Sequence, residues 1–165
     1  MFMIFVTVSG WPFERLIKKM DDIGSKTREK VVMQIGDTKY TPKHAEYFRF
    51  TSTGRIEELN RKARIIVSHG GAGCIIRALR LKKPLIVVPR YKKFGEHVND
   101  HQLDLTVVLE GDGKITAVYD IDNLEVAIKS AIRGSKTENK KNGLVEYIKG
   151  YIEGLDDKYE HSNGK

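Results

Sequence analysis

Short apolar runs alternate with amphipathic stretches along most of the chain. The runs at residues 2–8, 30–35, 65–67 and 85–88 show little polar alternation, which is typical of strands buried on both faces of a parallel sheet. Residues 47–50 alternate in polarity and predict a further short strand. The pattern therefore predicts a sheet in which most strands are buried on both faces.

Segments with helical spacing lie between and after these strands. Phe13, Leu16, Ile17 and Met20 form the i, i+3, i+4, i+7 stripe that seats a helix on a sheet, in a helix opened by Trp11-Pro12 and ended at Gly24-Ser25. Further helices are predicted at 54–61, from 74 to the lysines before Pro84, at 120–132 and at 144–155. Residues 107–109 fit either a helix or a short strand, and 114–118 fit an edge segment.

This alternation predicts an α/β fold, a Rossmann-like, open and mostly parallel sheet flanked by helices. Residues 1–135 would form the domain, 136–155 a polar connector and an amphipathic helix, and 156–165 a frayed tail. In a parallel sheet the carboxyl ends of the strands share one edge, where such folds bind ligands. Segments that follow the strands therefore form one candidate site, although they are distant in sequence.

A glycine-rich turn, Ser68-His69-Gly70-Gly71-Ala72-Gly73, joins the strand at 65–67 to the next helix. Glycines let the backbone approach a ligand, and the N–H groups and dipole of a helix N-terminus suit a phosphate, to which His69 would add a donor. A tight turn that needs glycine for its backbone geometry is the alternative, which explains one or two glycines more easily than three. The dinucleotide fingerprint and the P-loop sequence are both missing, which argues against NAD binding and ATP hydrolysis.

A cluster of polar side chains follows the strand at 85–88 and so reaches the same edge. It consists of Glu96, His97, Asn99, Asp100, His101 and Gln102. Carboxylates and amides pair well with vicinal hydroxyl groups, so this cluster and a phosphate turn together suggest a nucleotide sugar. A solvated helix start is one alternative. A metal site in which His97 and His101 share a helical face is another, but it lacks the glutamate of the H-E-x-x-H arrangement.

Composition narrows the function further. A net charge of +7 raises nucleic acid or an anionic membrane as partners, but the basic residues are scattered and no aromatic-basic nucleic-acid motif is present. No apolar run reaches the ~20 residues that span a bilayer, and the apolar start of the chain lacks the basic residues of a signal peptide. The single Cys74 excludes an internal disulfide and fits a reducing cytoplasm. It is either a small packed residue or a thiol nucleophile, and nothing nearby in sequence marks a base for it.

The central run carries a resemblance to a known family. SHGGAGCIIRALRLKKPLIVVPRYKKFGEHVNDHQ resembles the C-terminal, donor-binding half of GT-B glycosyltransferases of the MurG type (family 28), through its HGGAG and EHVNDHQ segments. It is most similar to the short, single-domain subunits: the PssE-type proteins of bacterial exopolysaccharide synthesis, and the soluble subunit of the eukaryotic transferase that adds the second N-acetylglucosamine to a dolichol-linked acceptor. The resemblance covers about residues 1–135. The family usually has Gly-Thr after the first strand, where this chain has Ser9-Gly10.

The resemblance implies roles for residues at the predicted edge, and their position adds Ser9 and Gly10 to the cleft. The implied nucleotide-sugar contacts are Gln34, Gly36 and Phe50 near the uridine, Ser68, His69, Gly70, Gly71 and Gly73 at the diphosphate, and Glu96, Asp100 and Gln102 at ribose or sugar hydroxyls. His69 and Arg90 are the implied catalytic residues, Arg90 by adding positive charge against the leaving diphosphate. Catalysis would be electrostatic stabilisation of the leaving group, with no cofactor besides the UDP-sugar substrate and no required metal.

The resemblance also implies a partner, because a GT-B enzyme needs a second Rossmann-like domain to bring the acceptor and usually the general base. At 165 residues the chain is too short to contain one. It would be the donor-binding, catalytic subunit of a two-component hexosyltransferase, inactive alone. A membrane-anchored, PssD-like partner would hold a lipid-linked acceptor and recruit the chain from the cytoplasm to the membrane. The helix at 144–155 would dock this partner or pack on its own sheet. The alternatives are a non-enzymatic nucleotide-sugar-binding or regulatory module, and a basic nucleic-acid-binding domain, which the scattered charge disfavours.

Overall fold

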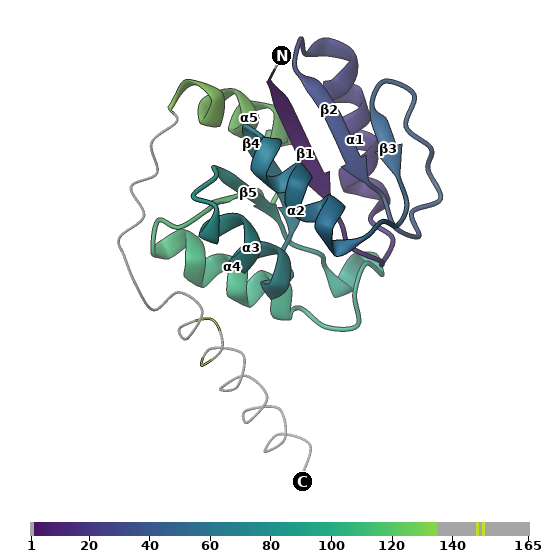
Figure 1. The fold of residues 1–165 in the computed structure, drawn as a ribbon. Helices are drawn as coiled ribbons and strands as arrows, with labels where there is room; N and C mark the ends of the chain where they lie inside the picture. Colours follow the sequence, from purple (N-terminus) through teal and green to yellow (C-terminus); the bar gives the residue numbers. More distant parts are fainter. Residues whose placement is uncertain (1, 135–147, 149, 151–165) are drawn as a thin grey trace, which may run out of the picture.

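The computed structural model describes residues 2–134, 148 and 150, and its strands form one sheet (Figure 1). The strands are β1 (Met3–Thr7), β2 (Lys30–Gln34), β3 (Glu46–Phe48), β4 (Ile65–His69), β5 (Leu85–Val88) and β6 (Thr116–Ala117). Their order is β3-β2-β1-β4-β5-β6, and every neighbouring pair is parallel. The predicted open, parallel α/β sheet is confirmed, and its strand order is that of the Rossmann fold.

Helices cover both faces of the sheet (Figure 1). They are α1 (Glu14–Lys26), α2 (Thr53–Lys62), α3 (Ala72–Arg80), α4 (His101–Gly111) and α5 (Leu124–Arg133), with short 3-10 turns η1 (Lys92–Phe94) and η2 (Ile121–Asn123). α1 and α5 pack on one face, whereas α2, α3 and α4 pack on the other. No helix in the described part of the chain is both long and apolar enough to cross a bilayer.

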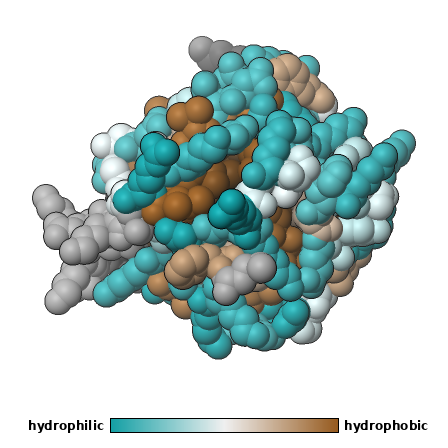
Figure 2. All heavy atoms as spheres, turned by 90° about the horizontal axis from the view of Figure 1, so that it is seen from above, coloured by the Kyte–Doolittle hydropathy of each residue, from teal (hydrophilic) through white to brown (hydrophobic). Residues whose placement is uncertain are grey.

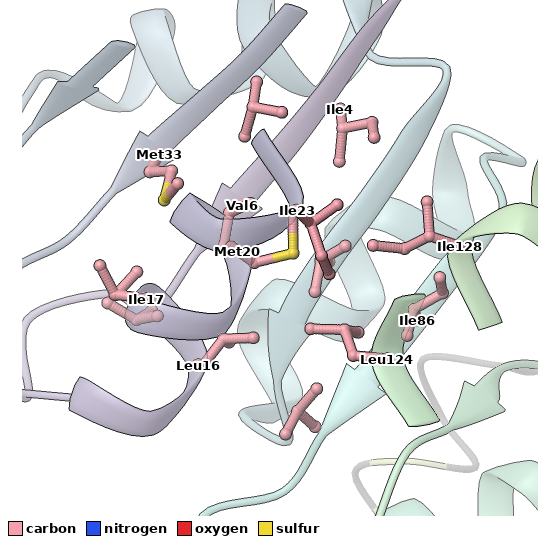
Figure 3. Packing of buried hydrophobic residues seen from close by; sticks show 14 of the residues in the cluster. Ile4, Val6, Leu16, Ile17, Met20, Ile23, Met33, Ile86, Leu124 and Ile128 are labelled. Atoms are coloured by element: carbon pink, nitrogen blue, oxygen red, sulfur yellow. The ribbon is translucent and has the colours of Figure 1, made fainter. Parts of the chain in front are cut away.

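The inner strands divide their side chains between two hydrophobic cores. Ile4 and Val6 of β1 belong to the core under α1 and α5, whereas Met3 and Phe5 belong to the core under α2, α3 and α4. Figure 3 shows the first core, where side chains from α1 and α5 pack against those of β1, β2 and β5. Because both faces are covered, these strands read in the sequence as continuous apolar runs.

The first helix differs from its predicted bounds. α1 starts beyond Pro12 and runs through Gly24, whereas the pattern predicts a start at Pro12 and an end at Gly24. The N–H of Phe13 donates to Thr38 Oγ1 at 2.9 Å, which holds the residues before α1 in the loop. Gly24 serves packing instead of termination, because a Cβ there would lie 3.2 Å from the carbonyl oxygen of His44.

The structure shows the conformation of the two segments, 107–109 and 114–118, that the sequence pattern did not settle. Residues 107–109 are helical within α4, and 116–117 form the edge strand β6. Leu105 and Leu109 of α4 are buried, whereas Val107 is 53% exposed. Because an apolar residue here faces solvent, the apolar positions of this stretch do not show the spacing of a helix.

Of the helix predicted at 144–155, only Ile148 and Gly150 are described, and both are helical. Ile148 is fully buried and belongs to the core under α2, α3 and α4. At this position, packing on the chain's own sheet is therefore favoured over docking to a partner. The remainder of the predicted connector and helix (136–155) and the tail (156–165) lie outside the described residues.

The edge of the sheet where the strands begin exposes apolar residues in a hollow framed by polar ones (Figure 2). A cavity of about 210 Å³ lies at this edge, between α5 and the starts of β5 and β6. Leu85, Ile115 and Ala131 are among its lining residues. This cavity is at the opposite end of the strands from the glycine turn, so it is not part of the candidate site.

Candidate functional site

The carboxyl ends of the strands lie side by side at one edge of the sheet, the lower edge in Figure 1. The chain order reverses between β1 and β4, with β2 and β3 on one side and β5 and β6 on the other. Such a switch point leaves a crevice between the loops that follow the two strands, and open α/β sheets bind ligands there. The loop after β1 and the glycine turn after β4 are the two loops at this point.

A buried polar network joins the ends of β1, β2 and β4. Thr7 Oγ1 donates to Gln34 Oε1 at 2.6 Å, and Ser68 Oγ donates to the His69 carbonyl at 3.0 Å. The side chains of Thr7 and Ser68 also form hydrogen bonds with the Cys74 thiol. Burial raises the pKa of this thiol, so Cys74 is a protonated, packed residue at neutral pH rather than a thiolate nucleophile.

His69 ends β4 and is 5% exposed. Burial and the positive charge of Arg90 lower the pKa of its ring to about 3, so the ring is neutral at physiological pH. Its Nδ1 lies 3.4 Å from the Thr7 carbonyl oxygen, and a Cβ added to Gly71 would overlap its Nε2. A proton on Nδ1 makes Nε2 an acceptor. The predicted role of His69 as a donor to a phosphate, if filled by Nε2, therefore requires the other tautomer.

The glycines of the turn have different surroundings. A Cβ on Gly70 would lie 2.8 Å from the Cβ and the carbonyl oxygen of Gln102, and a Cβ on Gly71 would overlap His69. No atom lies within 4 Å of a Cβ added to Gly73, which faces open space in the first turn of α3. No side chain of the described residues caps this helix. Packing therefore explains two of the glycines, while the start of α3 remains open at the third.

The loops after β1 and β2 lie in contact. Gly36 has a φ of +51°, and an added Cβ would overlap the carbonyl oxygens of Ser9 and Gly10. Ser9 has a φ of +58°, and the N–H of Asp37 donates to the Gly10 carbonyl at 2.8 Å. The Phe50 ring is 61% exposed and lies 3.9 Å from the position of a Cβ on Gly10. Ser9, Gly10, Gly36 and Phe50 are therefore brought together, and an exposed aromatic ring lies beside glycine backbone.

Arg90 follows β5 and is 2% exposed. Its Nη2 donates to the carbonyls of Val8 at 2.8 Å and Trp11 at 2.7 Å, and its guanidinium lies 5.0 Å from the centre of the Phe13 ring. Burial lowers its pKa to about 10, which leaves the side chain charged at neutral pH. Its Nε is buried and has no hydrogen-bond partner among the described residues. Arg90 thus clamps the loop after β1 and places a positive charge behind the switch point.

Two carboxylates hold the loop after β5 in shape. Glu96 Oε1 and Oε2 accept from Arg15 Nε and Nη2, each at 2.9 Å, and Oε2 also accepts from the N–H of Tyr91 at 3.0 Å. Asp100 Oδ1 accepts from the N–H of Lys92 at 2.8 Å. Glu96 and Asp100 therefore have a structural role, and a contact with sugar hydroxyls would come in addition to it.

Gln102 lies between this loop and the glycine turn, and is 8% exposed. Its Oε1 accepts from the N–H of Arg90 at 3.3 Å, and its carbonyl accepts from Thr106 Oγ1 at 2.6 Å. Gln102 also packs against Gly70, so it connects the ends of β4 and β5 with α4.

Arg15 and Trp11 are residues at this edge that sequence reasoning missed. Arg15 reaches Glu96 across 81 positions of sequence, and no local pattern marks such a pair. Trp11 is 51% exposed, and its ring lies 5.4 Å from the His97 ring. The sequence offers one signal that Trp11 belongs to the site: this single tryptophan of the chain directly follows the Ser9-Gly10 loop.

The hypothesis of a helical metal site is wrong in its geometry. His97 precedes α4 and its Nδ1 lies 3.1 Å from Asn99 Oδ1, whereas His101 is the first residue of α4. The two imidazoles therefore do not share a helical face. Across residues 2–134 and the two described residues beyond them, no three His, Cys, Asp or Glu side chains are grouped as metal ligands would be. That the site requires no metal stays a prediction.

Comparison with known proteins identifies the fold family. The Glycosyltransferase family 28 C-terminal domain matches residues 3–149. The chain belongs to this family. The human protein UDP-N-acetylglucosamine transferase subunit ALG13 is 30% identical over 123 residues, which cover 68% of this chain and 10% of that protein. The mouse protein of the same name is 28% identical over 122 residues, with shares of 67% and 10%. The chain thus spans about a tenth of the length of these curated relatives.

Solved structures show the same fold at lower identity. MurG from Acinetobacter baumannii is similar with a TM-score of 0.58 and 12% identity, over 78% of this chain and 40% of that chain. The solution structure of ALG13 has a TM-score of 0.52 and 19% identity, with shares of 85% and 88%. The UDP-GlcNAc 2-epimerase from Neisseria meningitidis, bound to UDP-GlcNAc, has a TM-score of 0.61 and 16% identity, with shares of 94% and 45%. The family-28 domain of this chain is therefore a GT-B half-domain, which confirms the resemblance seen in the sequence.

Proposed function

We propose that this chain is the donor-binding, catalytic subunit of a two-component glycosyltransferase. It would bind a UDP-sugar and transfer its hexose to a lipid-linked acceptor that a membrane-anchored partner subunit holds. The observation that carries the proposal is the open, uncapped start of α3 at Gly73, at the switch point of a family-28 domain.

The diphosphate of the donor would bind at the start of α3. The first N–H groups of the helix and its dipole favour negative charge there. Gly70 and Gly71 let the turn pack closely on Gln102 and His69, and Gly73 leaves room for phosphate oxygens. Ser68 Oγ already donates to a backbone carbonyl and would act by supporting the turn.

The uridine would lie over the loops after β1, β2 and β3. Phe50 offers an exposed ring for stacking on the base, and the backbone of Gly10 and Gly36 lets a flat ligand approach. Gln34, bonded to Thr7 at the end of β2, and Ser9 complete this side of the crevice. Gln102, Glu96 and Asp100 follow β5 and would line the side of the crevice that takes the sugar.

Transfer breaks the bond between the anomeric carbon and the diphosphate oxygen and forms a bond from that carbon to the acceptor hydroxyl oxygen. Negative charge develops on the diphosphate, and the helix dipole stabilises it without reorganisation. Arg90 would act at longer range, because its Nη2 is bound to two carbonyls. Neutral His69 would orient the diphosphate or a sugar hydroxyl. The acceptor proton would pass to a base on the partner.

A partner subunit is part of the proposal. The described domain corresponds to one half of the GT-B fold, and a complete GT-B cleft lies between two such halves. The human relative is named as a transferase subunit, which supports a two-component enzyme. The partner would be PssD-like and would recruit the chain to the cytoplasmic face of a membrane. No nucleic-acid partner is expected.

The test has two parts. Thermal unfolding with a panel of UDP- and GDP-sugars is expected to show stabilisation by a UDP-sugar, because a ligand bound only to the folded state raises its stability. Sugar transfer is then measured with the chain alone and with its partner, and is expected only for the pair. Robust transfer by the chain alone would contradict the two-subunit proposal. If none of the UDP-sugars raised the unfolding temperature, the donor site would be contradicted.

A nucleotide-sugar-binding module without activity is the second candidate. It is favoured by the engagement of both His69 and Arg90 with backbone carbonyls, which leaves neither committed to the open crevice. His69→Gln and Gln102→Ala variants of the reconstituted pair separate the two functions. Lost transfer with retained folding supports the enzyme, whereas unchanged transfer supports the module.

A further inference from the structure

A groove of about 310 Å³ runs between α2 and α3. Its walls come from Glu57 and Arg61 of α2 and from Gly73, Ile76, Arg77 and Arg80 of α3, with Leu81 at the end of α3. Gly73 belongs both to this groove and to the glycine turn, so the groove begins beside the start of α3 and extends along the helix away from it.

The charge of the groove is strongly unbalanced. Arg61 and Glu57 form an exposed pair with a distance of 3.4 Å, one turn apart on α2. Within the described residues, the guanidiniums of Arg77 and Arg80 have no ion pair and no hydrogen bond. These two arginines are three positions apart and so project from the same side of α3, where like charges repel. An anion between them would remove that repulsion.

The dipole of α3 accounts for only part of this arrangement. Basic residues near the end of a helix are favourable in themselves, which explains Arg77 and Arg80 on α3. Arg61, which is paired with Glu57 on α2, adds a third arginine to the lining of the same groove. Arginines therefore reach this groove from two helices, and this arrangement favours a bound anion.

We propose that this groove binds a phosphate-bearing anion, at a site separate from the diphosphate of the nucleotide sugar. Arginine presents a planar fork of N–H donors that matches phosphate oxygens in a bidentate way. Ile76 and Leu81 provide an apolar surface for the group that carries the phosphate. A volume near the lower end of the ~300–1,000 Å³ range of small-molecule sites fits one phosphate and part of its carrier. The site does not depend on sugar transfer by the chain.

Such a phosphate has two possible sources, a free phosphate compound or the headgroup of a membrane lipid. The chemistry at the arginines is the same in both cases. A free compound reaches the groove from solution, whereas a lipid headgroup is presented at a membrane surface. A soluble probe and a vesicle probe therefore separate the two sources.

The test uses the full chain and inorganic pyrophosphate, with backbone amide NMR shifts followed at constant ionic strength. The amides of Arg61, Ile76 and Arg80 are expected to titrate as one set, distinct from those of Gly70 and Gly71 at the turn. The R77Q/R80Q variant should weaken the groove set about tenfold or more and leave the turn set unchanged. Binding at the turn alone would support the donor site and overturn the groove site, so the two proposals fail separately.

The matched control is R55Q/K62Q, which removes the same charge from α2 at residues that do not line the groove. It should change the affinity of the groove set by less than about twofold. Equal weakening of the groove set by both variants would show that pyrophosphate senses diffuse surface charge, and would overturn the site. Groove amides that do not respond to pyrophosphate would also overturn it, and would leave an acidic protein segment as the ligand of the groove.

Vesicles of phosphatidylcholine, with and without phosphatidic acid, separate the two sources. Binding only to vesicles with phosphatidic acid, and its loss in R77Q/R80Q, would support the lipid headgroup. Pyrophosphate binding without vesicle binding would support the free compound.

Discussion

Arg15 and Glu96 lie 81 positions apart, and a bidentate ion pair with two contacts of 2.9 Å joins them across the edge of the sheet. Arg15 is 19% exposed and Glu96 10%, so the pair is largely shielded from solvent. Arg15 Nη2 also donates to the carbonyl of Pro89, at the end of β5. The pair therefore fixes the loop after β5 to α1, and through it the position of the polar residues that lead into α4.

Breaking this pair should destabilise the domain. Arg15→Met leaves a largely buried carboxylate without its main partner, so the free energy of unfolding should fall by about 1–3 kcal/mol in urea denaturation. The double variant R15M/E96Q should lose less than the sum of the single losses, because the two side chains act together. Lys129→Gln, in the more exposed pair with Glu125, should cost less than about 0.5 kcal/mol. Additive losses in the double variant would contradict the coupling.

The sequence predicts those features that depend on neighbours along the chain. The strands follow from apolar runs and the turn from its glycines, and both are confirmed. Arg90 shows where prediction from sequence neighbours fails. Its place after β5 puts it at the edge, but the direction of its side chain depends on which carbonyls it reaches, those of Val8 and Trp11. Those carbonyls belong to a loop about 80 positions away. The same holds for Arg15, whose partner no local pattern indicates.

The glycines of the turn should separate stability from binding. Gly70→Ala places a Cβ 2.8 Å from Gln102 and should cost about 1–3 kcal/mol of stability, because the start of α4 must move. Gly73→Ala meets no atom within 4 Å and should be neutral or up to about 1 kcal/mol more stable. A methyl group at Gly73 should nevertheless weaken binding of a UDP-sugar. Calorimetric titration together with thermal unfolding checks both effects, and unchanged UDP-sugar affinity in Gly73→Ala would place the diphosphate elsewhere.

His69 should make stability depend on pH. Its pKa is about 3 in the fold and near 6.5 in the unfolded chain, so between these values only the unfolded chain binds the proton. Its contribution to stability is therefore complete above about pH 6.5 and is lost as the pH falls toward 3. Below about pH 6 the free energy of unfolding should fall by up to about 1.4 kcal/mol per pH unit from this group.

The measurement is urea denaturation between about pH 6 and 5, before most carboxylates titrate. His69→Gln should remove this part of the slope while other titrations remain. If that variant does not fold, the ring can be followed directly by NMR in the native chain. A His69 ring that gains its proton near pH 6.5 would contradict the burial argument.

Phe50 should bind the base without supporting the fold. Its ring is 61% exposed, so Phe50→Ala should change stability by less than about 0.5 kcal/mol. Stacking of a base on an aromatic ring contributes about 1–3 kcal/mol, so UDP should bind roughly 5- to 150-fold more weakly to the variant. Phe2→Ala is the control, because Phe2 is 65% exposed and stands before β1 at the opposite edge of the sheet. Isothermal titration with UDP compares the two. Equal UDP affinity in Phe50→Ala and the unmodified chain would move the uridine away from the loop after β3.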